Sequence, residues 1–209
     1  MTSVVATTPA YDHTELRHVL RAGAQLGVLQ SATVAAFAYA SRLLSGPVEL
    51  GVLTLILIVG VAATISLPGL WTKAKHIEGI AGAAGIGLFA TVVFLLVDVS
   101  VFQPLGIYSN RWLAIGGGSN WWYHPVWWMV GTFMPWMGAL ILASQTVKSG
   151  APNPLMLVVG TLGLAAVVMA VAVVAHVPGA AFGVGTYGVS VLPALAIFAT
   201  ISAVWASRQ

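Results

Sequence analysis

Apolar residues form six nearly continuous stretches along this chain, each about twenty residues long. An α-helix rises about 1.5 Å per residue and the hydrocarbon core of a bilayer is roughly 30 Å thick, so each stretch can cross a membrane as one helix. Gly and Pro mark most of the short connections between the stretches, as is typical where helices end. The pattern predicts membrane-spanning helices near residues 23–44, 48–69, 79–104, 122–145, 153–176 and 184–206.

The predicted fold is therefore an all-α, polytopic membrane protein in which residues 23–206 form one six-helix transmembrane bundle. A more polar segment, residues 1–22, precedes it. Within this segment Asp12-His13-Thr14-Glu15 has the pattern of a capping box, which predicts the start of a short amphipathic helix on the membrane surface.

Composition agrees with a membrane protein and excludes several kinds of chemistry. Hydrophobic residues make up 59% of the chain and charged residues 6%, against about 25% charged in soluble domains. The chain has no cysteine, which excludes disulfides and thiolate metal sites. The eight Lys and Arg form no run, so the net charge of +3 does not indicate nucleic acid. We expect the lipid bilayer and other membrane subunits as partners.

The distribution of Lys and Arg predicts the orientation of the bundle. If the N-terminus is cytoplasmic, six of these residues lie inside and two outside, in agreement with the positive-inside rule. The inner group is Arg17, Arg21, Lys73, Lys75, Lys148 and Arg208, and the outer group is Arg42 and Arg111. Both termini are then expected in the cytoplasm and the bundle in the plasma (inner) membrane.

The third stretch carries a row of small residues. Gly79, Ala83 and Gly87 recur at four-residue spacing and so share one helix face. Such a face allows two helices to approach closely. It predicts tight packing, either within the bundle or against a partner subunit.

In this orientation the ionisable residues of the spans gather toward the outer side, at Asp98, His124, His176 and Glu49. A carboxylate at mid-helix costs roughly 2.5–3.5 kcal/mol to insert, and less near the interface. Asp98 should therefore face the bundle and find a partner, which could be His124, His176, Arg111, a metal ion or water. The alternative is a shallow Asp98 that reaches water at the headgroups or pairs structurally with Arg111.

Two kinds of cofactor site are open at this outer side. Asp98, His124 and His176 could form a mixed nitrogen and oxygen site for copper or another transition metal, with Glu49 in reserve. The alternative is that the histidines are ordinary interface residues at helix ends.

Aromatic residues suggest the second kind of site. Trp121, Trp122 and Trp127 surround His124 in the sequence. They indicate either an aromatic belt at the membrane interface or a binding site for a quinone or pigment.

The middle of the chain resembles the metal-ligand segment found in one of the membrane subunits of copper-dependent membrane monooxygenases. The resemblance rests on the runs Asp98-Val99-Ser100-Val101-Phe102-Gln103, His124-Pro125-Val126 and Gly131-Thr132-Phe133. The family pattern has an Asp, a His four positions later and a second His thirteen beyond that. Positions 102 and 115 hold Phe and Ile here, so the resemblance implies a divergent relative in which only Asp98 matches directly.

Three functions are compatible with the sequence. The first is a subunit of a membrane redox or metalloenzyme complex rather than a stand-alone enzyme. The second is a small transporter or channel, in which Pro68, Pro135 and Pro193 could break helices. The third is a scaffold or pigment-associated subunit without chemistry of its own.

Overall fold

The computed structural model describes residues 13–108 and 123–207, with the side chains of 123–125 excepted. Its described part consists of helices and turns without any strand, which confirms the all-α prediction. The long helices are α1 (Leu16–Leu43), α2 (Gly46–Trp71), α3 (Ile77–Val97), α5 (Tyr123–Ser149), α6 (Pro154–Val174) and α7 (Val184–Ala206). A π-helical turn, η1 (Asp98–Phe102), continues α3.

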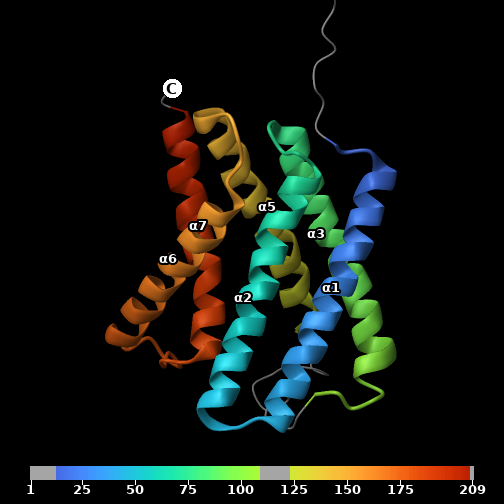
Figure 1. Ribbon diagram of the computed structural model, residues 1–209, viewed down its shortest axis with the longest axis vertical. Coiled ribbons are helices and arrows are strands. Elements are labelled where there is room, and N and C mark those ends of the chain that lie inside the picture. Colours follow the sequence, from blue (N-terminus) through green and yellow to red (C-terminus); the bar gives the residue numbers. More distant parts are fainter. Residues whose placement is uncertain (1–12, 109–122, 208–209) are drawn as a thin grey trace, which may run out of the picture.

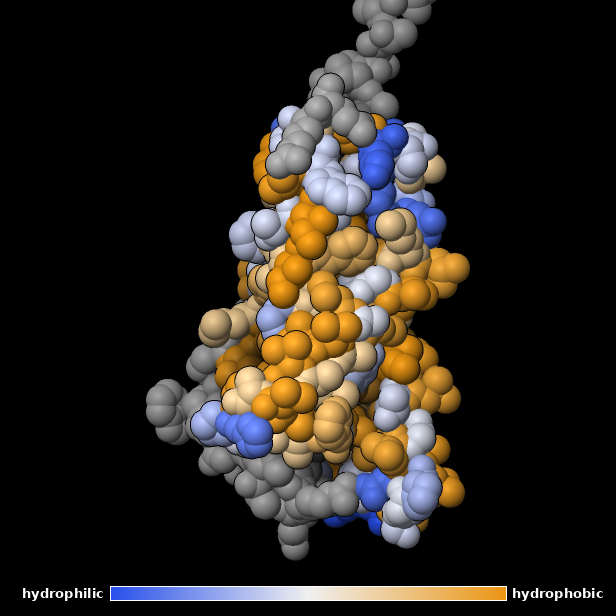
Figure 2. Space-filling model, turned by 90° about the vertical axis from the view of Figure 1, so that its left-hand side faces the viewer, coloured by the Kyte–Doolittle hydropathy of each residue, from blue (hydrophilic) through white to orange (hydrophobic). Residues whose placement is uncertain are grey.

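The chain is an integral membrane protein by the length and composition of its helices. Five segments are long and apolar enough to cross a bilayer, namely Gly46–Trp71, Ile77–Phe102, Val126–Ser149, Pro154–Val174 and Val184–Ala206. The remaining long helix, α1, is more polar and runs beside them (Figure 1). Figure 2 shows apolar side chains over the middle of one face and hydrophilic side chains toward its two ends, as contact with lipid requires.

The N-terminal region differs from the predicted surface helix. The residues between 16 and 23 form the first turns of α1, which continues without a break to Leu43. Ala22 and Gly23 are buried, and a Cβ at Gly23 would lie 2.9 Å from the side chain of Phe89 on α3. This contact ties the polar turns to the bundle. Residues 1–12, where the predicted capping box starts, lie outside the described part of the chain.

Both described ends of the chain lie at the same end of the bundle, because six long helices alternate in direction (Figure 1). The His13 N–H donates to the Thr72 carbonyl at 2.9 Å, which brings the start of α1 to the end of α2. The Lys148 Nζ lies 4.9 Å from the centre of the Trp205 ring, which brings the ends of α5 and α7 together. We call this the basic end, after Arg17, Arg21, Lys73, Lys75 and Lys148.

Glycines bring the central helices into close contact. A Cβ at Gly138 of α5 would overlap the Ile65 carbonyl oxygen of α2, and one at Gly87 of α3 would overlap the Gly131 carbonyl oxygen of α5. The row of small residues on α3 therefore packs within the bundle, which is one of the two alternatives that the sequence left open. Beside these crossings lies the largest cluster of buried side chains, including Ile65, Ile141, Leu142, Leu157 and Leu195.

Candidate functional site: an interhelical cavity

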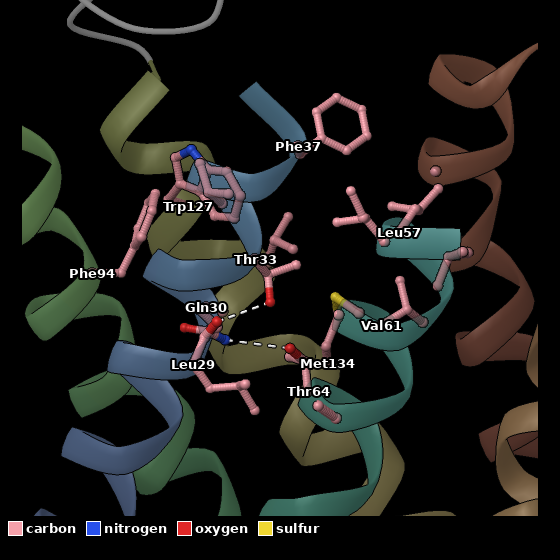
Figure 3. A pocket seen from close by; sticks show the side chains of 18 of the residues that line it. Leu29, Gln30, Thr33, Phe37, Leu57, Val61, Thr64, Phe94, Trp127 and Met134 are labelled. Atoms are coloured by element: carbon pink, nitrogen blue, oxygen red, sulfur yellow. Dashed lines mark hydrogen bonds between the residues drawn. The ribbon is translucent and has the colours of Figure 1, made fainter. Parts of the chain in front are cut away.

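A cavity of about 570 Å³ lies between α1, α2, α5 and α7 (Figure 3). This volume falls within the roughly 300–1,000 Å³ of typical small-molecule sites. Most of its wall is apolar, with Leu, Ile and Val side chains prominent among the lining residues. A site of this size and character suits a lipid-soluble molecule.

A few polar groups interrupt the apolar wall, among them the amide of Gln30, near the middle of α1. Gln30 Nε2 donates to Thr64 Oγ1 of α2 at 3.4 Å (Figure 3). Nearby, the Thr33 hydroxyl donates to the Leu29 carbonyl within α1 at 2.8 Å. A primary amide offers two N–H donors and a carbonyl acceptor, and among the described residues this amide makes only the one long hydrogen bond. It therefore has capacity left for a ligand or water.

Aromatic side chains form another part of the wall. The rings of Phe94 and Trp127 lie 4.8 Å apart, centre to centre, in a tilted arrangement. Phe37 of α1 lies across the cavity from them (Figure 3). Trp127 was predicted as a cofactor-binding residue, and the structure places it in this wall. Trp121 and Trp122, the other two in that prediction, lie outside the described residues.

Asp98 lies beyond the aromatic wall, one helical turn after Phe94, and is fully buried. Its carboxylate accepts hydrogen bonds from the Tyr108 hydroxyl and from Gln103 Nε2, the latter at 2.7 Å. The π turn explains the second contact, because the Gln103 N–H donates to the Asp98 carbonyl five residues back and so places both side chains on one face. Neither partner was among the predicted ones.

The other predicted metal ligands are not brought to Asp98 by the described residues. His176 is exposed in a left-handed turn (φ 54°) after α6, a helix that packs mainly against α7. His124 lies in the first turn of α5, but its side chain is outside the described part. Glu49 lies in the first turn of α2. No three His, Asp or Glu among the described residues are close enough to hold a metal ion, so the metal site stays a prediction.

The cavity itself was not predicted, although its polar residues were visible in the sequence. Gln30 and Thr33 are polar positions within an apolar span, and only the pairing of α1 with α2 shows that they face a common space. Comparison with known proteins adds nothing to this geometry: no protein-family model, curated protein or solved structure matches the chain. The resemblance to copper-dependent membrane monooxygenases therefore stays a prediction.

Proposed function

We propose that this integral membrane protein binds a lipid-soluble molecule in the interhelical cavity, with an apolar body and at least one hydrogen-bonding group. The observation that carries the proposal is the Gln30 amide, which borders a largely apolar cavity with most of its hydrogen-bonding capacity unused. An amide without partners in an apolar environment costs roughly 2–7 kcal/mol, depending on the reference state. A polar group on a bound molecule would offset this cost.

The test compares Gln30→Leu with Gln25→Leu, a matched change on the same helix. Gln25 is exposed and does not line the cavity. Each protein is purified in mild detergent or nanodiscs, and the bound small molecules are extracted and identified by mass spectrometry. We expect the wild type and Gln25→Leu to retain a common lipid-soluble molecule, and Gln30→Leu to retain several-fold less, because a net hydrogen bond contributes about 0.5–1.5 kcal/mol. A wild-type protein with only water in its cavity would contradict the proposal.

We further propose that the chain performs this role as a subunit of a membrane redox or metalloenzyme complex. The supporting observation is that Phe94 and Trp127 belong both to the cavity wall and to the buried cluster around Tyr108, the partner of Asp98. A buried carboxylate and a ligand cavity thus share one wall. Because the described residues do not supply three metal ligands, further ligands would come from His124 or from partner subunits.

The complex is tested by purifying the assembly from native membranes. Co-purifying subunits, together with copper or another transition metal in stoichiometric amount, are the expected result. A protein that purifies alone, without metal and without visible absorption, would contradict the complex while leaving the ligand cavity in place.

A further inference from the structure

The cavity is open on the side of α7. Val189 lines it and yet is 69% exposed, so the wall is incomplete at this point. Gly185, one turn earlier, also lines the cavity, and no described atom lies within 4 Å of the position that its Cβ would take. Since α7 is long and apolar enough to span a membrane, an opening beside it leads into the bilayer rather than into water.

The opening ends where α2 and α7 come into contact. A Cβ at Gly188 would lie 3.7 Å from Leu57 of α2, an ordinary van der Waals distance, and Figure 3 shows Leu57 pointing from α2 toward α7. The free space next to Gly185 therefore belongs to a slot between the start of α7 and α2. Glycine is significant here because any larger side chain at position 185 would extend into this space.

The polar and open parts of the cavity lie on different helices. The Gln30 amide and the Thr64 hydroxyl belong to α1 and α2, whereas the opening is formed by α7. A cavity of about 570 Å³ holds a ring-sized head group with a short piece of chain. A longer molecule must leave part of its length outside.

We infer that the ligand is a long-chain lipid whose carbonyl or hydroxyl head group binds Gln30 and whose tail leaves through the slot at Gly185 into the bilayer. This inference rests on the proposed ligand cavity and adds the class of the ligand and its route. The tail remains in hydrocarbon both inside and outside the protein, so no apolar surface meets water during loading.

The experiment uses two probes with the same head group, methyl-benzoquinone and decyl-benzoquinone, and measures their binding in nanodiscs by native mass spectrometry. Gly185→Trp is designed to fill the slot. Gly163→Trp is the control, since Gly163 of α6 also has no described atom within 4 Å of its Cβ position and does not line the cavity. Gly185→Leu is a smaller replacement in case the Trp variant does not fold.

We expect Gly185→Trp to weaken binding of the decyl probe at least tenfold and to change binding of the methyl probe less than twofold. Gly163→Trp should change neither. Equal binding of the decyl probe to the wild type and both Gly185 variants would overturn the inference but leave the cavity's function intact. If neither probe binds the wild type and no lipid co-purifies with it, the proposed function itself fails.

Discussion

At the scale of single residues, Asp98 shows how the protein accommodates a carboxyl group within an apolar helix. The group is fully buried, and neutral donors on Tyr108 and Gln103 satisfy both of its oxygens. Removing one partner of a buried acceptor costs about 1–3 kcal/mol, because the remaining group stays desolvated. The arrangement is therefore expected to stabilise the end of α3 and the turn that follows.

Tyr108→Phe tests this arrangement. It removes one hydroxyl and leaves the ring to pack against Phe102, whose ring centre lies 6.3 Å away. We expect a loss of about 1–3 kcal/mol in unfolding free energy, measured by denaturation in detergent, and no loss for Tyr39→Phe, because Tyr39 is half exposed. In a double-mutant cycle with Asp98→Asn the two losses should not add. Additive losses would show that the hydroxyl and the carboxyl act independently.

The sequence predicted that Asp98 faces the bundle and has a partner, and this is confirmed. The cost of an ionisable group in lipid was enough to make that prediction. It did not identify Gln103 or Tyr108, because their approach depends on a π turn. Such a turn differs from an α-helix by one residue in hydrogen-bond spacing, and hydrophobic periodicity does not reveal it.

At the scale of helices, close packing decides the architecture. The six apolar stretches predicted the helices well, since length and hydropathy alone determine whether a segment spans a bilayer. The helices α2, α5 and α7 continue through Pro68, Pro135 and Pro193 without interruption, so the broken helices considered for a transporter are not present there. Which helices are neighbours was not predicted, because several helices carry small residues and the sequence does not pair them.

Two glycines of α3 provide a matched test of the packing. A Cβ at Gly87 would overlap the backbone of Gly131 on α5, whereas one at Gly85 would lie 3.5 Å from Val19 on α1. We expect Gly87→Ala to reduce the unfolding free energy by about 1–3 kcal/mol through overpacking. Gly85→Ala should be neutral or slightly stabilising, because alanine favours a helix by up to about 1 kcal/mol. Comparable losses for both variants in thermal denaturation would argue against a specific α3–α5 contact.

At the scale of the whole molecule, charge is distributed unequally between the two ends. Within the described residues Arg17, Arg21, Lys73, Lys75 and Lys148 lie at the basic end, and Arg42 lies at the other. That makes five Lys or Arg against one, with an apolar band between them in the view of Figure 2. The fold thus brings together charges that are far apart in the sequence, and this asymmetry supports the proposed orientation with the basic end in the cytoplasm.

The orientation is tested with single cysteines, because the chain contains none of its own. Ser149 ends α5 at the basic end and Ser45 precedes α2 at the opposite end, and both are exposed. In intact cells a membrane-impermeant maleimide should label Ser45→Cys, whereas Ser149→Cys should react only after the membrane is permeabilised. The reason is that Lys and Arg near the ends of spans are retained on the cytoplasmic side. Labelling of Ser149→Cys in intact cells, with Ser45→Cys protected, would reverse the orientation and place the buried Asp98 on the cytoplasmic side.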